Sequence, residues 1–159
     1  MFSLKSRGKK VLKIRVSAEI RHTESPEKVK RALKNVFIPV SLVVRTHSNG
    51  LILVTESNKP YSLKKLHYLL RKQLILDSAR EYLKRGIAGT KITFYLHKQA
   101  AYAGIVSFCS VPEKESPLGP IKFEIYCKSE EDIEKLLNWL APRTVRGRPV
   151  NEQKSPPDP

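Results

Sequence analysis

A group of cationic side chains around one tyrosine gives this sequence its clearest chemistry. Lys64, Lys65, Tyr68, Arg71 and Lys72 share the face of a predicted helix that lies opposite its leucine stripe. Lysine and arginine neutralise phosphates and release counterions, and a tyrosine among them can stack on an unpaired base or pack along a sugar. This pattern predicts contact with a nucleic acid. The further candidate contacts are Arg80, Lys84, Arg85, Lys91, Lys98, Gln99, Arg143, Arg146 and Arg148.

The distribution of charge supports this hypothesis. The chain has 159 residues, with 30 Lys and Arg against 15 Asp and Glu, and a net charge of +15. Residues 1–98 carry 22 basic and 6 acidic side chains, whereas residues 99–159 carry 8 basic and 9 acidic ones. Such an asymmetry is typical of a surface that faces a polyanion, and we favour nucleic acid over an anionic membrane surface. The alternative is a solvated basic surface in a protein adapted to a hot or salty cell.

The residue types that commonly carry catalysis or bind metals are scattered along the chain. The four histidines, His22, His47, His67 and His97, lie far apart, and none stands in an H-x-x-x-H or H-E-x-x-H context. Helix capping and surface ion pairs on predicted helices explain the acidic clusters. The sequence therefore predicts no catalytic residue, no metal site and no cofactor. An enzyme acting on phosphorylated or nucleic-acid substrates is the weakest alternative.

The glycines of segment 86–91 do not form a known phosphate loop. A Walker loop has four residues between its glycines and then Lys before Ser or Thr, between a strand and a helix. Here two residues separate Gly86 from Gly89, and Thr precedes Lys. The spacing is that of a KH loop, but a strand follows instead of a helix. We interpret the segment as a helix end and a turn, although its glycine N–H groups could still touch a phosphate.

The cysteines and the hydropathy of the chain indicate where in the cell the protein is located. Cys109 and Cys127 have no metal-ligand spacing. We expect them on two strands that could be adjacent in the sheet, as small buried hydrophobes or, alternatively, as a redox pair. No run of residues approaches the roughly 18 apolar residues of a membrane span, and the basic N-terminus lacks the apolar stretch of a secretory signal. We expect a cytoplasmic protein without membrane association.

The periodicity of the first half predicts the elements that position these side chains. Residues 12–21 alternate between apolar and polar types and predict a strand. Ser25 and Pro26 predict the start of a helix that runs to about Phe37. Asn49-Gly50 predicts a hairpin between the runs 40–46 and 51–56. In segment 63–85 the apolar residues lie on two opposite faces, which predicts two helices with a break near residues 72–74.

The second half is predicted to complete a layered α+β domain. It holds strands at 92–96, 102–109 and 121–127, a loop at 111–120, and a helix that Ser129 caps and that ends before Pro142. This order predicts a single domain over residues 10–142, with a mostly antiparallel sheet and helices packed on one face. Residues 1–9 are predicted to be a basic, flexible N-terminus, and the proline-rich, basic residues 143–159 a flexible tail.

Four segments taken together resemble an archaeal family of conserved proteins of uncharacterised function. They are LLRKQLILDSAREYLKRG (69–86), ITFYLHKQAAYAGIVSF (92–108), ESPLGPIKFEI (115–125) and NWLAPRT (138–144). The opening IRVSAEIRHTESPEKVKRALKNVF (14–37) also resembles the start of that family. Members are labelled predicted RNA-binding or exosome-associated. The resemblance implies a fold like that of the large-subunit ribosomal protein that binds 5S rRNA. The segment 110–114 departs from the family pattern and looks like a loop extension.

The resemblance implies no catalytic or ligand-binding residues. Its family-like polar positions here are Arg71, Lys72, Gln73, Asp77, Arg80, Lys98, Gln99, Ser116, Pro117, Gly119, Pro120, Arg143 and Thr144. We therefore expect a non-enzymatic protein that binds structured or double-stranded RNA through its basic surface. The alternative is a protein-interaction or assembly factor, including a homodimer, in an RNA-processing or ribosomal complex.

Overall fold

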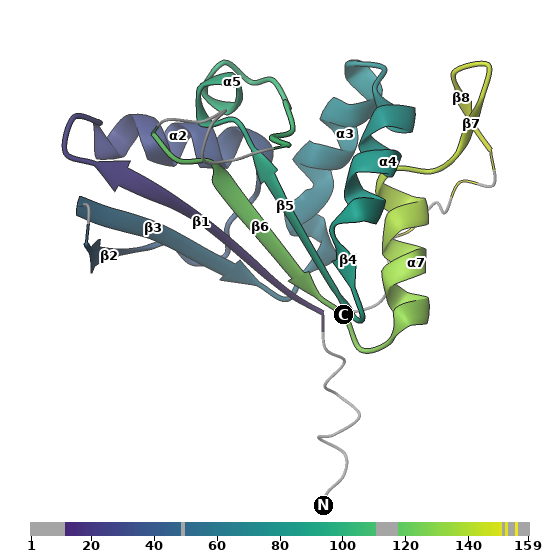
Figure 1. Ribbon diagram of the computed structural model, residues 1–159, viewed down its shortest axis with the longest axis horizontal. Helices are drawn as coiled ribbons and strands as arrows, with labels where there is room; N and C mark the ends of the chain where they lie inside the picture. Colours follow the sequence, from purple (N-terminus) through teal and green to yellow (C-terminus); the bar gives the residue numbers. More distant parts are fainter. Residues whose placement is uncertain (1–11, 49, 111–117, 151, 153–154, 156–159) are drawn as a thin grey trace, which may run out of the picture.

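The structure, a computed structural model, describes residues 12–48, 50–110, 118–150, 152 and 155 (Figure 1). The predicted N-terminal segment 1–9, most of the loop 111–120 and much of the end of the tail lie outside the described residues. Among the helices that are described, none is long and apolar enough to cross a membrane.

A six-stranded antiparallel sheet forms the centre of the molecule, which confirms the predicted fold class. Its strands lie in the order β2-β3-β1-β6-β5-β4, and every neighbouring pair is antiparallel. The period-two alternation of β1 buries Ile14, Val16, Ala18 and Ile20 on one face of the sheet. The strands are β1 (Lys13–Arg21), β2 (Val43–His47), β3 (Gly50–Ser57), β4 (Ile87–Ala88), β5 (Lys91–Leu96) and β6 (Ile121–Tyr126).

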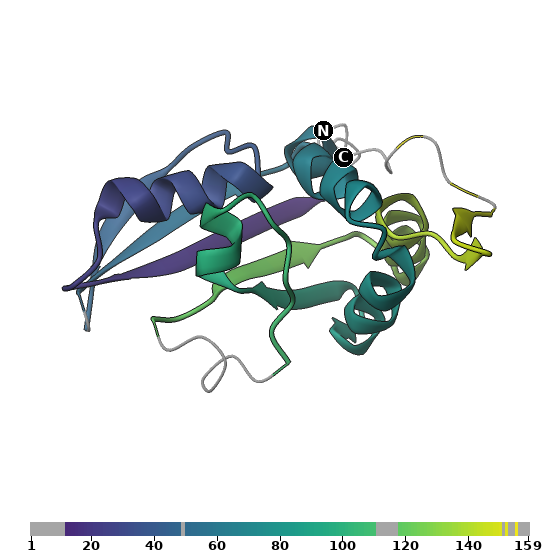
Figure 2. The same cartoon turned by 90° about the horizontal axis from the view of Figure 1, so that it is seen from above.

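The described helices cover that apolar face, and none of them lies on the opposite face of the sheet, which we call the open face (Figures 1 and 2). α2 and α5 lie side by side over one part of the sheet, whereas α3, α4 and α7 cover the other. The serines predicted as N-caps, Ser25 and Ser129, accept hydrogen bonds from the first turns of α2 and α7. The helices are α2 (Pro26–Val36), η1 (Pro60–Leu63), α3 (Lys64–Lys72), α4 (Leu76–Arg85), α5 (Lys98–Tyr102) and α7 (Glu130–Leu140).

The helical segment 63–85 is broken into two helices at the position where its apolar residues change from one face to the other. α3 ends at Lys72 and α4 begins at Leu76, and between them Leu74 has a left-handed φ of 59°. This turn lets Leu66 and Leu70 face the core from α3 while Ala79 and Leu83 face it from α4. The predicted pair of helices is thus confirmed, with its break at residues 73–75.

The predicted strand at 102–109 is wrong. The chain instead forms α5, a turn and an irregular segment whose one ladder contact is the bridge between Leu96 and Phe108. Backbone hydrogen bonds join only its end to β5: the Cys109 N–H donates to the Tyr95 carbonyl, and the Ser107 carbonyl accepts from the His97 N–H. Distant side chains bond other backbone groups of the segment. Asn35 donates to the carbonyls of Ala101 and Tyr102 at 2.9 and 3.1 Å, and Gln73 bonds both the N–H and the C=O of Val106.

The glycine segment 86–91 ends one element and begins another, as predicted. Gly86 closes α4, and β4 and β5 then form a tight hairpin around Gly89. A Cβ at Gly86 would lie 2.1 Å from the carbonyl oxygen of Thr93, so the close approach of these two backbones requires glycine.

Within the segment that we expected to be flexible, the structure places a short hairpin. Strands β7 (Thr144–Val145) and β8 (Arg148–Pro149) pair around a turn at Arg146 and Gly147. The Thr144 hydroxyl donates to the Asp77 carboxylate at the start of α4, which joins this hairpin to the helical layer.

Candidate nucleic-acid interface

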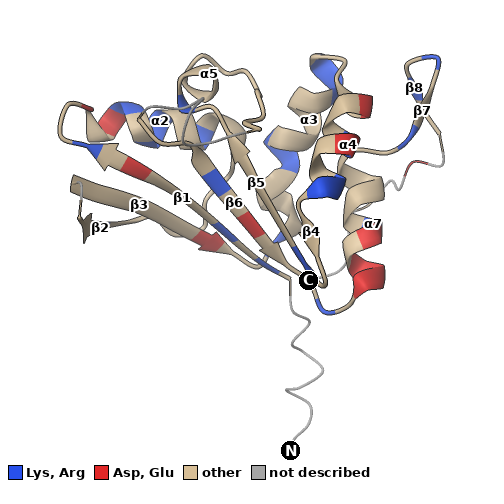
Figure 3. Ribbon diagram, in the orientation of Figure 1, with Lys and Arg blue, Asp and Glu red and all other residues tan. Residues whose placement is uncertain are grey.

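A group of exposed cations lies on α2 and α3. The two helices are in direct contact, and the Lys65 ammonium donates to the Lys34 carbonyl oxygen at 2.6 Å. Glu27 is the acidic residue of α2, and α3 has none. Figure 3 marks the basic positions in blue on the ribbons of both helices. We call this the α2–α3 surface, and its exposed cations are Lys28, Arg31, Lys34, Lys64, Lys65 and Lys72.

Three tyrosines are interleaved with these cations. Tyr61 and Tyr68 are each 60% exposed, and Tyr102 of α5 is 40% exposed. Each ring carries a neighbouring cation: Lys64 lies 5.8 Å from the Tyr61 centroid, Lys72 5.9 Å from that of Tyr68, and Arg31 5.9 Å from that of Tyr102. Cation–π contacts hold these charges and aromatic faces together at the surface, where both can meet phosphates and bases.

Sequence reasoning identified only the α3 half of this surface. It missed Lys28, Arg31 and Lys34, which lie on the solvent side of α2. A signal was present, because the run KVKRALK (28–34) has four cations and no acid at helical spacing. The proximity of the two helices is tertiary, however, and no local pattern predicts it.

The other exposed residues predicted as contacts lie outside α2 and α3. Lys84 and Arg85 are exposed on α4, and Arg143, Arg146 and Arg148 lie on or next to the β7–β8 hairpin. Gln99 is exposed on α5 beside the first turn of α2. Figure 1 shows that the hairpin and α2 lie at opposite ends of the molecule.

The open face of the sheet also carries cations, but acids neutralise many of them. Lys91 lies there, 3.2 Å from the Glu124 carboxylate, and this hydrogen bond is the main reason that the pKa of Lys91 is raised. Arg15 contacts both Glu56, at 3.2 Å, and Glu124. Lys122 lies 3.7 Å from Glu124. This lattice of ion pairs makes the open face a poorer polyanion site than the α2–α3 surface.

Two arginines predicted as RNA contacts are partly buried and bind groups of the protein itself. Arg71 donates to the carbonyls of Trp139 and Leu140 at 3.1 and 3.2 Å, and to Glu152 at 2.6 Å. Arg80 donates to the Ala141 carbonyl and to the Asn138 side chain. α7 has no basic residue in its last turn, so α3 and α4 supply the cations that satisfy its terminal carbonyls.

We predict that removing either arginine lowers stability. Arg71→Ala and Arg80→Ala should each reduce the free energy of unfolding by about 1.5–3 kcal/mol, because charged hydrogen bonds to buried carbonyls are lost. Chemical denaturation measures this effect. The exposed Arg85→Ala is the matched control on the same helical pair and should change the value by less than about 0.5 kcal/mol. Equal effects of all three substitutions would contradict the capping role.

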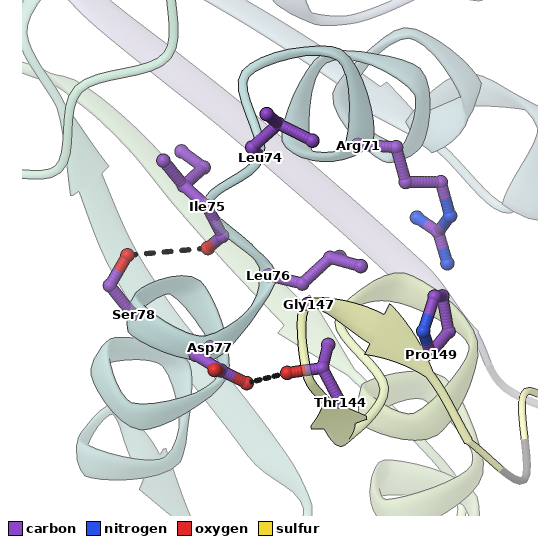
Figure 4. A pocket seen from close by; sticks show the side chains of 9 residues that line it. All are labelled: Arg71, Leu74, Ile75, Leu76, Asp77, Ser78, Thr144, Gly147 and Pro149. Atoms are coloured by element: carbon purple, nitrogen blue, oxygen red, sulfur yellow. Dashed lines mark hydrogen bonds between the residues drawn. The ribbon is translucent and has the colours of Figure 1, made fainter.

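A cleft of about 450 Å³ lies between the α3–α4 turn and the C-terminal hairpin (Figure 4). Leu74, Ile75 and Pro149 give it apolar walls, and Leu74 is 85% exposed. Its cation, Arg71, is already bound by Glu152 and by α7, and its acid, Asp77, accepts from Thr144. The polar groups of this cleft therefore serve to attach the C-terminal segment.

His67 stacks on Trp139 beneath this region, with ring centroids 4.6 Å apart. Burial, with the nearby Arg71 charge, lowers the pKa of His67 to about 4. In the unfolded chain His67 is protonated as the pH falls below about 6.5, whereas in the folded protein it is protonated only near pH 4. Stability on account of His67 therefore falls as the pH decreases from about 6.5 to about 4.

We predict that protonation of His67 contributes measurably to the loss of stability at acidic pH. The loss should be about 1–2 kcal/mol, because solvent screening at a partly exposed site reduces the full linkage value. His67→Phe keeps a ring against Trp139 but does not titrate, so its unfolding free energy should change less between pH 6.5 and 4. The measurement is denaturant unfolding across this range, and identical pH profiles of the two proteins would refute the role.

Lys98 is buried and not a surface cation, although Lys98 and Gln99 were predicted as a corner that holds a backbone. Its side chain is 6% exposed, and its ammonium donates to both Glu24 carboxylate oxygens at 3.0 Å. It also donates to the carbonyls of Glu19 and Leu118, each at 2.7 Å. Burial lowers the pKa of Lys98, whereas the Glu24 hydrogen bond opposes this. Lys98 ties β1, α5 and the chain before β6 together.

The described residues contain no group of three or more His, Cys, Asp and Glu side chains that could hold a metal ion. Cys109 and Cys127 are both buried, and burial raises the pKa of Cys127 to about 11. Their backbone N–H groups bond Tyr95 and Thr90, at opposite ends of β5. A strand of that length separates them by about 16 Å, so they are not adjacent and cannot form a redox pair.

The fold is a small antiparallel α+β domain with exposed cations on its helical layer, and comparison with known proteins identifies its family. A family model described as RNA binding matches residues 13–126. A UPF0201 protein of Metallosphaera sedula is 47% identical over 146 residues, which cover 92% of this chain and 99% of that protein. A UPF0201 protein of Aeropyrum pernix is 44% identical, over 91% of this chain and 95% of its own length.

A solved structure agrees with these sequence matches. The crystal structure of a UPF0201 protein from Methanococcus jannaschii is 34% identical and superposes with a TM-score of 0.77, over 87% of this chain and 99% of that one. The chain therefore belongs to the archaeal UPF0201 family. This result confirms the resemblance to a conserved archaeal family with an RNA-binding description.

Proposed function

We propose that this protein is a non-enzymatic RNA-binding protein that holds structured RNA on the α2–α3 surface. The observation that carries the proposal is the set of six exposed cations on two helices in contact, with three exposed tyrosines beside them and Glu27 as the acidic residue of the two helices. The RNA-binding description of the family model supports the ligand class. The exosome association and the likeness to the 5S rRNA-binding ribosomal protein stay predictions.

The chemistry of the surface favours shape and charge over sequence. Lysine side chains dominate it, and they contact phosphates as flexible point charges that do not read a base edge. Double-stranded RNA presents phosphates and 2′-hydroxyls, and its deep, narrow major groove hides the base edges from side chains. We therefore expect weak sequence preference.

The test is binding of the full-length protein to a structured RNA, a DNA duplex and heparin over a salt series. If about six phosphates are neutralised, RNA affinity should fall about a thousandfold between roughly 50 and 200 mM salt. RNA should be bound more tightly than DNA or heparin at each salt concentration. Equally weak binding to all three ligands, or an affinity that does not change with salt, would refute the proposal.

One observation favours a second candidate function, docking of a protein partner. β2 is an edge strand of the sheet, and it and its surroundings expose Val40, Val43, Val44 and Leu51 by 61, 42, 38 and 36%. An apolar edge strand can add a strand of another chain. Light scattering discriminates between the two functions: a tight dimer that does not bind RNA would favour the assembly factor.

A further inference from the structure

A cleft of about 390 Å³ opens between the first turns of α2 and the short helix α5. Figure 2 shows α5 lying directly beside α2. Val29 and Ala32 are buried and give the cleft an apolar floor, while Leu118 closes one side. Lys28 and Tyr102 belong both to this cleft and to the group of side chains on the α2–α3 surface. The cleft is thus continuous with the proposed RNA interface.

The walls of this cleft are held in place from both ends of α5. At its start, the buried Lys98 ammonium binds Glu24 and the carbonyls of Glu19 and Leu118. At its end, the Asn35 amide donates to the carbonyls of Ala101 and Tyr102. A helix of five residues has little stability alone, so these contacts fix its position against α2. The cleft therefore exists before a ligand arrives, which lowers the entropic cost of binding.

The side chains that line the cleft match one chemical class of ligand. The 40% exposed ring of Tyr102 supplies an aromatic wall, and Arg31 lies 5.9 Å from its centroid. Gln99 is exposed at the opening and carries both a donor and an acceptor, the pair of groups that a base edge requires. Lys28 adds a positive charge for the adjoining phosphate. The volume is at the small end of ligand clefts and suits one nucleoside.

We propose that this cleft holds one unpaired base of the RNA that lies on the α2–α3 surface. The inference rests on the proposed function and adds to it, since it makes the protein a reader of bulged or looped RNA. The base stacks on Tyr102, its edge meets Gln99, and its phosphate meets Lys28. In duplex RNA the bases are stacked and paired, so a duplex occupies only the α2–α3 surface.

The test compares two RNA probes, a fully paired duplex and the same duplex with a single unpaired 2-aminopurine. Wild-type protein should bind the bulged RNA about tenfold more tightly, in keeping with the stacking of one base on an aromatic side chain, and should change the 2-aminopurine fluorescence. Gln99→Ala should reduce this preference and leave duplex affinity unchanged. Tyr102→Ala should weaken binding of the bulged RNA much more than binding of the duplex, because the ring also belongs to the α2–α3 surface. Tyr102→Phe keeps the ring and should retain the preference, which separates stacking from a loss of fold.

Tyr61→Ala is the matched control, because Tyr61 is an exposed, lysine-paired tyrosine that does not line the cleft. It should affect both probes equally. If the wild type binds both probes without preference, or if Tyr102→Ala weakens both equally, the cleft proposal is wrong and the proposed function stands. If the wild type binds neither probe, both proposals fail.

Discussion

Reversing three charges on the α2–α3 surface is expected to lower the affinity for structured RNA by at least about a hundredfold at low salt. The variant is Lys34→Glu, Lys64→Glu and Lys72→Glu combined, because these three exposed lysines span both helices. Each substitution removes a cation that displaces a counterion and adds an anion that repels a phosphate. The slope of log affinity against log salt should also become shallower by about three.

A matched variant separates this surface from the net charge of the protein. Lys84, Lys128 and Lys135 are also exposed, and they lie on or before α4 and α7, outside the α2–α3 surface. Reversing these three charges changes the net charge by the same amount, yet it should lower RNA affinity less than about fivefold, through long-range repulsion alone. Equal losses in both variants would show that the binding is generic. Thermal unfolding of both variants checks that the fold is intact.

Replacing Lys98 by Met is expected to lower the free energy of unfolding by about 3–5 kcal/mol, the largest stability effect that we predict. The Glu24 side chain is 10% exposed and would lose its cation, while the Glu19 and Leu118 carbonyls would lose a donor. The Arg21 N–H still donates to Glu24, but a largely buried carboxylate that has lost its cation is costly. Denaturant unfolding measures the loss.

Two further variants test whether the ion pair is the cause. Lys98→Met combined with Glu24→Gln removes the uncompensated charge, so the double variant should be more stable than Lys98→Met alone. Gln99→Met, at the exposed neighbouring position, should change the stability by less than about 0.5 kcal/mol. A Lys98→Met protein within about 1 kcal/mol of the parent would show that the buried ammonium is not required.

Local patterns determined most elements of this fold. The alternation in β1 and the serine caps of α2 and α7 act within a few residues, so they can be read from the sequence. The break between α3 and α4 was also predictable, because one straight helix cannot bury two opposite apolar faces. The strand predicted at 102–109 was wrong because contacts with distant parts of the chain determine the structure of this segment. Asn35 and Gln73, which satisfy its backbone, lie 66 and 33 residues away from their partners in the chain.

For the candidate site, too, some features follow from the sequence and others only from the tertiary structure. The sequence by itself determined that the chain is strongly basic, that the excess lies in its first two thirds, and that α3 presents cations opposite its leucines. Only the tertiary structure decided which cations face solvent. Arg71, Arg80 and Lys98 have charges like those of their neighbours, but most of their partners, such as Glu152, Asn138 and Glu24, lie 58 to 81 residues away. Packing also brought α2 against α3, because the apolar stripes of both helices are buried on the same face of the sheet.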